Sequence, residues 1–536
     1  MSATTATPAV APAKLPRPAI LPRLISAFSG TTGLVVKIVL LSLMNAFAAW
    51  AIYVLITRKH WVAVIVLILA TLLLDAIYLI PRSWTLPLKF LVPGTVFLIA
   101  FQVIPILYTI QVSFTNYSTG HVITKSDAIT QIKVTSLQPP ANGRSYTMAA
   151  ARNSSGQLVL ILQDDTSHKN FVGTRKGLTP LPAGSVKTGA LGITSATGYT
   201  IVTGSALFAL DKTLQNYIVP VGSTGAGIRP QTISTAVELE PTLRYDAKRD
   251  AFIRISDGAV FHDNGKGAFV HGTDALEPGW KTGIGGKNFS RIAHDPLVRG
   301  PFLRVLVWTI VFAVSTVLIS FAVGLFLAIA LDKKGMRFQR IYRALIVIPW
   351  AIPGFLSLLV WQGLLNDQFG VVNRIFHINV PWLFDANWAK VSCILVSAWL
   401  TVPYFFLVSM GALQSIPEEL TEAGRVDGGG PFQLFRRVTL PLLLIAVAPL
   451  LIASFAFNFN NFNNIYLLTK GGPPQANSSV AGSTDILISY TYKIAIATGK
   501  GNDYGLACAV SIIIFIIVAV ISGISFSRTR VLEDIA

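Results

Sequence analysis

Residues 415–441 read SIPEELTEAGRVDGGGPFQLFRRVTLP, a polar stretch that lies between two strongly apolar segments. Ser415 is a favourable N-cap residue, and Glu418 three positions later completes a capping box. Pro417 falls early in the same helix, where its missing N–H costs nothing. The stretch therefore predicts a short helix that begins at Ser415.

The second half of this stretch predicts the end of that helix and the start of another element. Three consecutive glycines, Gly428 to Gly430, are typical of a helix terminus. Residues 432–438 then favour a second element, which leads into Leu440 and Pro441 and the next apolar segment. The whole of 415–441 is thus interpreted as a helix-turn-helix elbow at a membrane surface.

The composition of the chain indicates a membrane protein. Of its 536 residues, 52% are hydrophobic and 13% are charged, and the mean hydropathy is +0.59. A segment of about 20 apolar residues is long enough to cross the hydrocarbon layer, where it must be helical to pair its backbone groups. We expect eight such spans, at about residues 34–56, 62–80, 90–112, 302–331, 344–365, 390–413, 440–468 and 506–526.

The formal net charge of +18 is explained by membrane orientation rather than by nucleic-acid binding, because the basic residues are scattered over loops and not gathered with aromatic residues. With eight spans, four basic clusters fall on one side, which the positive-inside rule assigns to the cytoplasm. Both termini are then expected inside, and Arg58 and Lys59 run against the rule. The clusters are Lys14, Arg17, Arg23; Lys333, Lys334, Arg337, Arg340, Arg343; Arg425, Arg436, Arg437; and Arg528, Arg530.

The chain divides into four parts by composition. Residues 1–33, rich in Ala, Pro and Thr, are expected to form a flexible cytoplasmic tail without a cleavable signal. Residues 34–113 carry the first three spans, and residues 301–536 carry the other five with the elbow. Residues 114–300 are expected to form an extracytoplasmic domain.

This extracytoplasmic domain is expected to be rich in β-strands. Short alternating runs occur at 158–162, 199–202 and 251–255, and turn signals such as Asn142-Gly143, Ser155-Gly156 and Asp257-Gly258 separate them. About 180 residues suffice to bury a core.

The elbow resembles the signature cytoplasmic loop of the membrane subunits of ATP-binding-cassette importers, through Glu422-Ala423, Gly428 and Leu440-Pro441. The resemblance implies the type I importer permease fold and a short helix that docks on a partner ATPase, so that ATP-driven closure reaches the membrane helices. Gly424 stands where the family often carries a second alanine. The alternative is an ordinary amphipathic loop helix. The residues expected to couple to the ATPase are Glu422, Ala423, Gly424, Asp427, Gly428, Leu440 and Pro441.

Beyond the extracytoplasmic domain, long stretches of the sequence are similar to the larger, MalF-type membrane subunits of maltose/maltodextrin importers. The stretches are PFLRVLVWT at 301–309, YRALIVIPWAIP at 342–353, GALQSIP at 411–417 and IASFAFNFNNF at 452–462. The resemblance implies a location in the cell inner membrane and three partners: a second membrane subunit of the MalG type, a cytoplasmic ATPase dimer of the MalK type, and a periplasmic sugar-binding protein of the MalE type. ATP and magnesium would bind to the ATPase and not to this chain.

Five asparagines, at 458, 460, 461, 463 and 464, interrupt the apolar seventh span. Amides in hydrocarbon need partners, so these should face other helices or a watered cavity. Asn458 and Asn461, three positions apart, are expected to share one helical face with Phe457 beside them. Amides suit sugar hydroxyls and aromatic rings suit pyranose faces, although the same asparagines would also serve to tie helices together.

The MalF-type resemblance implies a sugar site at matching positions. Phe457, Asn458, Asn461, Leu400 and Tyr404 match the sugar-contacting positions of the family. Four further positions, Trp350, Gly354, Ser397 and Thr401, stand where the familiar maltose subunit has tyrosine, serine, asparagine and glycine. The implied pocket is retained in part, and Trp350 is expected to add a stacking face.

Other features of the sequence argue against competing functions. The chain has no GxxxxGK[ST] loop and no HExxH, and its two cysteines, Cys393 and Cys508, read as small buried hydrophobes. The alternative is a secondary sugar transporter driven by an ion gradient, but such a protein would place ionisable groups within its core spans. A sensor or scaffold would need no amide-lined pocket.

Isolated residues within the spans have structural interpretations. The fifth, sixth and seventh spans are expected to be interrupted by prolines, namely Pro349, Pro353, Pro403 and Pro449. A role in gating and a role in simple helix packing are both consistent with these prolines. The charged side chains of Lys37 and Asp75 are expected either to snorkel to the membrane surface or to form a structural pair.

Overall fold

A computed structural model describes residues 30–80, 85–189, 192–221, 226–332, 336–475, 478, 480–497 and 501–533. The expected N-terminal tail lies outside these residues up to position 29, and helix α2 already begins at Gly30, earlier than the predicted span. The chain divides into two compact units, residues 1–107 and residues 108–536.

The first unit consists of apolar helices. They are α2 (Gly30–Thr57), α3 (Trp61–Leu79), α4 (Thr85–Leu98), the π-helical turn η1 (Ile99–Val103) and the beginning of α5 (Ile104–Ser113). Helix α3 packs against both α2 and α4. The carboxylate of Asp75 accepts a hydrogen bond from Asn45 Nδ2 at 3.0 Å, so its partner is an amide and not Lys37. Asp75 therefore ties α3 to α2, as expected for a structural polar pair.

A β-rich domain lies between α5 and the fourth span, which confirms the predicted insert. Its main sheet runs in the order β5-β4-β3-β2-β11-β10-β9, and a second sheet runs β12-β13-β14-β15-β16. The predicted turns at Ser155-Gly156 and Asp257-Gly258 connect β2 to β3 and β13 to β14, which pair antiparallel. The strands are β1 (Leu137–Gln138), β2 (Ser145–Arg152), β3 (Leu158–Asp164), β4 (Asn170–Thr174), β5 (Gly177–Pro180), β6 (Val186–Gly189), β7 (Gly192–Ala196), β8 (Thr200–Ile201), β9 (Val219–Pro220), β10 (Gly227–Pro230), β11 (Thr235–Pro241), β12 (Leu243–Asp246), β13 (Ala251–Arg254), β14 (Val260–Asp263), β15 (Phe269–His271) and β16 (Asp274–Leu276).

Four helices accompany these strands: α6 (Lys125–Thr135), α7 (Ser205–Ala209), α8 (Asp211–Gln215) and α9 (Lys287–His294). Helix α6 packs on β12 and buries Ala128 and Ile132 against Phe252, Phe261 and Phe269. At the start of α6, Lys125 Nζ pairs with the carboxylates of Asp250 and Asp263. The hydrogen bond from Lys125 holds the pKa of Asp250 below its usual value. The helix is thus fixed to the second sheet by apolar packing and by charge.

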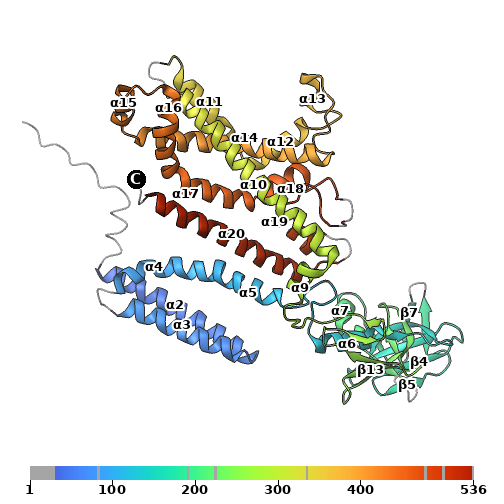
Figure 1. The fold of residues 1–536 in the computed structure, drawn as a ribbon. Coiled ribbons are helices and arrows are strands. Elements are labelled where there is room, and N and C mark those ends of the chain that lie inside the picture. Colours follow the sequence, from blue (N-terminus) through green and yellow to red (C-terminus); the bar gives the residue numbers. More distant parts are fainter. Residues whose placement is uncertain are drawn as a thin grey trace, which may run out of the picture. The chain divides into compact units, whose positions relative to one another are not determined.

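The membrane core of the second unit is built on α10 (Figure 1), which packs against α14 and α17, while α17 also packs against α20. The helices of this core are α10 (Pro296–Ala330), α11 (Gln339–Ala351), α12 (Gly354–Leu364), α13 (Val371–Phe376), α14 (Ala386–Ser415), α15 (Glu418–Val426), α16 (Pro431–Leu434), the π-helical turn η2 (Phe435–Thr439), α17 (Leu440–Phe459), α18 (Phe462–Thr469), α19 (Leu487–Tyr492), the π-helical turn η3 (Lys493–Ala497) and α20 (Tyr504–Glu533).

The described residues contain seven helices long and apolar enough to cross a membrane, or eight if one bent pair is a span. This confirms the predicted helical membrane fold. The bent pair lies at the predicted fifth span, where α11 and α12 meet at 92°, and it confirms the interruption expected at Pro353. Pro353 caps α12, and Ile352 before it is extended, as expected for a residue that precedes proline.

The seventh span also differs from the prediction. Helix α17 ends at Phe459, and α18 begins at Phe462, so the predicted continuous helix from 440 to 468 is wrong. The break coincides with the asparagines, whose side chains compete for backbone hydrogen bonds. Conversely, Pro403 and Pro449 lie inside unbroken helices, and of the four prolines only Pro353 stands at a break.

Candidate functional site: an elbow and an aromatic–amide pocket

The elbow begins differently from the prediction. Ser415 is the last residue of α14, and its hydroxyl donates to Ala412 O at 2.8 Å. Pro417, with φ −57° and ψ 130°, occupies the N-cap position of α15, and no side chain caps that helix. The predicted capping box of Ser415 and Glu418 is therefore wrong, because the preceding helix extends far enough to include Ser415.

The end of α15 is defined by its backbone. Gly429 N–H donates to Gly424 O at 2.9 Å, and Gly428 N–H donates to Arg425 O at 3.0 Å. Gly428 has φ +83°. These are the two bonds and the left-handed residue of a Schellman motif, which suits glycine because it has no Cβ. The chain then re-enters a helix at Pro431, one residue before the predicted start of the second element.

Gly424 has a packing role in the elbow. A Cβ placed on Gly424 would collide with a methyl carbon of Leu434, and one on Gly429 would lie 2.8 Å from Gly424 O. Leu434 of α16 is 9% exposed. The side chain of Leu434 therefore fills the space that the two glycines leave, and α15 and α16 form one compact unit.

The outer face of the elbow is open. Glu422, Ala423, Asp427 and Gly428 are exposed, and the apolar side chain of Val426 is 87% exposed. Val426 lies one helical turn after Glu422 and next to Asp427 in the chain, so an exposed apolar side chain adjoins two carboxylates on this face. At the far end of the elbow, Leu440 packs with Phe321, Phe405 and Leu443 in a core cluster of α10, α14 and α17, whereas Pro441 is exposed. The elbow thus has an exposed face at one end and, at the other end, a residue that packs in the membrane core.

The predicted sugar-site residues fall into three groups, of which the first surrounds Trp350 and Tyr404. The ring centroids of these two lie 6.1 Å apart at 53°, and the Trp350 side chain is 55% exposed. Gly354, at the start of α12, has open space where a Cβ would project. Helices α11 and α14 therefore present an accessible aromatic pair.

The second group lies where α17 breaks. Asn458 is 1% exposed, and its Nδ2 donates to Ser454 O at 2.9 Å, while its Oδ1 accepts no hydrogen bond from any described residue. Asn461 is the N-cap of α18 and accepts from Asn464 N–H at 3.3 Å. Asn458 and Asn461 therefore do not share one helical face, which corrects the prediction. Phe457 beside them is 69% exposed.

The third group lies on α14 and consists of Leu400, Thr401 and Ser397. Ser397 is buried, and its Oγ accepts from Asn464 Nδ2 at 3.0 Å, while Thr401 Oγ1 donates to Ser397 O at 2.8 Å. Leu400 is half-buried and packs against a cluster that includes Trp308 and Phe312. Ser397 thus joins α14 to α18, whereas no hydrogen bond or ring contact between described residues links Phe457 or Asn461 to Trp350.

The comparisons with known proteins bear on the whole chain. The family described as the binding-protein-dependent transport system inner membrane component matches residues 300–532, and the N-terminal region of the membrane subunit in binding-protein-dependent ABC transporters matches residues 96–176. The maltose/maltodextrin transport system permease protein MalF of Vibrio vulnificus strain YJ016 is 32% identical over 525 residues, which cover 95% of this chain and 97% of that protein. The chain belongs to the MalF family of permease subunits.

Other members are similarly related. MalF of Escherichia coli strain K12 is 31% identical over 481 residues, covering 87% of this chain and 92% of that protein. Among solved structures, a bacterial ABC transporter involved in the import of the acidic polysaccharide alginate has 21% identity and a TM-score of 0.40, covering 46% of this chain and 84% of that chain. Nothing in these comparisons favours the ion-gradient alternative.

In this MalF-type permease, the sequence did not predict that Asn464 bonds to Ser397, a residue of the predicted sugar site. The sequence showed an amide in an apolar stretch at 464, but its partner, Ser397, lies 67 positions away on another helix. No local pattern indicates such a bond. The run of amides in a membrane segment indicated that this region needs polar partners, but it did not indicate which residue each amide would bond.

Proposed function

We propose that this chain is the larger membrane subunit of an ATP-dependent importer of maltose- or maltodextrin-like oligosaccharides. It forms half of the translocation pathway, and a MalG-type subunit forms the other half. A MalK-type ATPase dimer binds ATP and magnesium on the cytoplasmic side, and a MalE-type periplasmic protein delivers the sugar. The chain itself is not an enzyme. The observation that carries the proposal is the elbow, with an open face at one end and Leu440 in the membrane core at the other.

The proposed mechanism is alternating access. ATP binding closes the ATPase pair, which moves α15, and the fixed packing of Leu434 against Gly424 passes that motion to α17 without bending the elbow. Because Leu440 packs with residues of α10 and α14, the displacement reaches the helices that carry Tyr404 and Asn458. The energy comes from ATP on the partner subunits, and this chain converts it into movement of the pocket.

The proposed sugar site combines the first two groups of residues, around Trp350 and around Asn458. Trp350 and Tyr404 offer an aromatic surface for a pyranose face, and Phe457 offers a second exposed ring. Asn458 Oδ1 is buried without a donor from the described residues, so a sugar hydroxyl would satisfy it. Compared with the familiar maltose subunit, Trp350 stands in place of tyrosine, and its larger ring supports a pocket with more stacking; Gly354 removes a hydroxyl where serine stands, and Thr401 adds one where glycine stands.

The proposed orientation places both termini and the elbow in the cytoplasm and the β-rich domain outside. Basic residues lie within the elbow, with Arg425, Arg436 and Arg437 all exposed, which is the pattern of a cytoplasmic loop. The protein is accordingly a multi-pass protein of the cell inner membrane.

The coupling role is tested by Glu422→Arg in the assembled importer. Glu422 is exposed on α15, so its reversal removes a docking carboxylate without disturbing packing. We expect membrane insertion to be unchanged and both sugar uptake and sugar-stimulated ATP hydrolysis to fall at least roughly tenfold, because like-charge contacts at an interface cost several kcal/mol. Uptake and hydrolysis are measured in proteoliposomes with ATP enclosed.

Glu240→Arg is the matched control, because Glu240 is also exposed but lies on β11, far along the chain from the elbow. It should leave both activities near the unmodified level. Unchanged uptake by the Glu422→Arg importer would refute the docking role, and uptake driven by a proton gradient without ATP would refute the importer assignment.

A further inference from the structure

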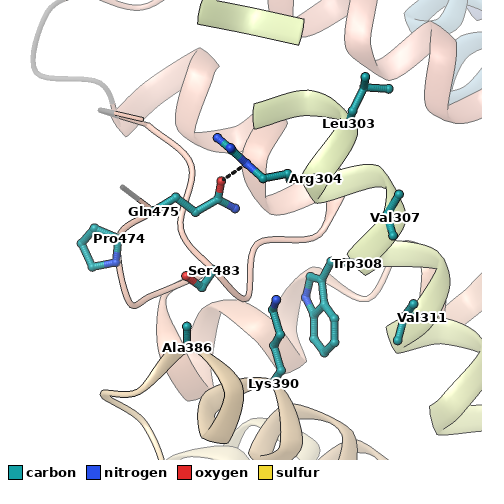
Figure 2. A pocket seen from close by; sticks show the side chains of 10 residues that line it. All are labelled: Leu303, Arg304, Val307, Trp308, Val311, Ala386, Lys390, Pro474, Gln475 and Ser483. Atoms are coloured by element: carbon teal, nitrogen blue, oxygen red, sulfur yellow. Dashed lines mark hydrogen bonds between the residues drawn. The ribbon is translucent and has the colours of Figure 1, made fainter. Parts of the chain in front are cut away.

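A pocket outside the proposed sugar site lies between the N-terminal parts of α10 and α14 and the connection between α18 and α19 (Figure 2). Its volume is about 880 Å³. The residues that give it its chemistry are Leu303, Arg304, Val307 and Trp308 of α10, Lys390 of α14, and Gln475 of the connection. One side of the pocket is cationic and the other is apolar.

Among the described residues, no acidic side chain balances the cationic side. Arg304 Nε donates to Gln475 Oε1 at 3.0 Å, which leaves both Nη groups without a partner among the described residues. Lys390 Nζ lies 5.3 Å from the ring centroid of Trp308 and pairs with no described carboxylate. The described lining contains no acidic residue. Two positive charges therefore face one cavity, an arrangement that favours an anion.

The apolar side continues along a membrane helix. Leu303, Val307 and Val311 are 43%, 61% and 45% exposed and recur every fourth residue, so they form one face of α10. Val314 and Leu318, 38% and 59% exposed, carry this face further. From Leu303 to Leu318 the helix rises about 22 Å, which exceeds half of the hydrocarbon layer. A fatty acyl chain has the length and polarity to cover this face.

The walls of the pocket are fixed before any ligand binds. Trp308 Nε1 donates to Thr484 O at 3.1 Å, and Gln475 Nε2 donates to Gly482 O at 2.9 Å. The two carbonyls belong to Gly482 and Thr484, and the adjacent Asp485 is buried, pairs with Lys493 at 2.6 Å, and accepts from Gly482 N–H at 2.6 Å. Preformed walls lower the ordering cost of binding.

We propose that this pocket binds one phospholipid with an anionic headgroup, with its phosphate between Arg304 and Lys390 and an acyl chain along Leu303, Val307 and Val311. An acidic protein surface would satisfy the two cations but would leave the apolar face of α10 uncovered. Coulombic attraction holds the phosphate and the hydrophobic effect holds the acyl chain, so one phospholipid uses both sides of the pocket. The inference goes beyond sugar import and does not depend on which sugar is carried.

The test uses the assembled importer in nanodiscs of phosphatidylglycerol mixed with phosphatidylcholine, with bound lipid counted by native mass spectrometry after extraction. The double variant Arg304→Gln/Lys390→Gln should retain roughly tenfold less phosphatidylglycerol than the unmodified complex, because each surface cation contributes a few-fold in affinity. Val307→Trp, which fills the apolar side and keeps both charges, should also lower retention.

The matched control is Arg299→Gln/Arg374→Gln, which removes two exposed cations outside the pocket and should retain phosphatidylglycerol normally. Equal retention by the double variant, or equal retention of phosphatidylcholine by the unmodified complex, would overturn the proposal. Binding of inorganic phosphate as tight as that of the lipid would show that the acyl chain contributes nothing and would overturn it too. Loss of a partner subunit with lipid retention unchanged would assign the pocket to a protein contact instead. All four outcomes are independent of the sugar and ATP assays above.

Discussion

At the scale of a single residue, Asn458 carries a buried polar atom that no described residue satisfies. Its Nδ2 is bonded within its own helix, whereas its Oδ1 is buried without a donor from the described residues. An unmade hydrogen bond of a buried group costs about 1–3 kcal/mol. Such a cost is expected at a binding site, where a ligand supplies the missing donor.

Asn461 provides a test of the sugar site. Asn461→Ala should weaken sugar uptake by roughly tenfold while basal ATP hydrolysis is largely retained, because the amide is lost at the pocket and not at the elbow. Alanine also removes the N-cap of α18, which accepts from Asn464 N–H. Asn461→Ser is therefore the matched variant: it keeps a capping oxygen but is too short to reach a sugar.

Uptake is measured as a function of sugar concentration. If the serine variant restored full uptake, the effect of alanine would be one of capping alone. Unaltered sugar dependence in both variants would remove Asn461 from the pocket.

The bond between Ser397 and Asn464 gives a second prediction at this scale. Ser397→Ala should destabilise the purified importer by about 1–3 kcal/mol, because it leaves the Asn464 amide buried without its acceptor. Adding Asn464→Leu should recover much of that loss, since both polar partners are then gone. A double-mutant cycle followed by denaturant unfolding measures the coupling, and additive effects of the two substitutions would contradict the bond.

The elbow is the element to which the proposed mechanism assigns coupling, and its shape comes from its glycines. Its terminus is a Schellman motif, and its two short helices close on each other through Leu434 and Gly424. No interaction with the solvent-exposed face of α15 is needed to hold this shape. The element can therefore present Glu422 and Val426 to a partner while it keeps its own geometry.

Gly428→Ala tests the turn directly. With φ at +83°, a Cβ is strained there by about 1 kcal/mol, so amide exchange at the end of α15 should accelerate roughly fivefold, and coupling of ATP hydrolysis to uptake should weaken. Hydrogen exchange read by mass spectrometry measures the first effect. Gly430→Ala is the control, because Gly430 has φ −69° and open space for a Cβ. Equal exchange in the two variants would show that the turn does not depend on Gly428.

The broken helices have different causes. The 92° bend between α11 and α12 stands at Pro353, which forces the residue before it into an extended conformation. The interruption between α17 and α18 contains no proline and stands at Asn460 and Asn461. Both breaks adjoin the proposed pocket, with Gly354 after the first and Asn458 before the second. Irregular backbone at membrane depth is tolerated where it lines a cavity.

At the scale of the whole molecule, the orientation of the chain is the feature that the transport model requires. The β-rich domain and the elbow are separated by three helical crossings, α10, the α11–α12 pair and α14, if the bent pair spans the membrane. An odd number of crossings puts the two on opposite sides. The bent pair therefore determines which face of the membrane each functional region meets.

Cysteine labelling tests this orientation. In a chain carrying Cys393→Ala and Cys508→Ala, we introduce Ser155→Cys in the β-rich domain or Gln433→Cys in the elbow, both at exposed positions. A membrane-impermeant maleimide added to spheroplasts should label the first variant and not the second. Permeabilisation should expose both. Labelling of the elbow variant in intact spheroplasts would place the elbow outside and contradict the coupling model.

The membrane fold, the β-rich insert and the existence of the elbow could all be predicted from the amino-acid sequence, because each depends on local composition. Apolar runs long enough to cross a bilayer, alternating strands with turn residues, and three consecutive glycines are patterns of neighbouring residues. The families matched by residues 96–176 and 300–532 agree with that interpretation.

The partner of Ser397, the break after Phe459 and the position of Ser415 at the end of α14 became known only from the folded chain. The same is true of Arg304 and Lys390, which are far apart in the sequence and face one cavity. Each of these features depends on which helices pack together. Hydropathy patterns and helix propensity depend on residues that are close together in the sequence. Where a helix ends or bends, and which polar bonds it forms, also depends on the residues that another helix brings next to it in the fold.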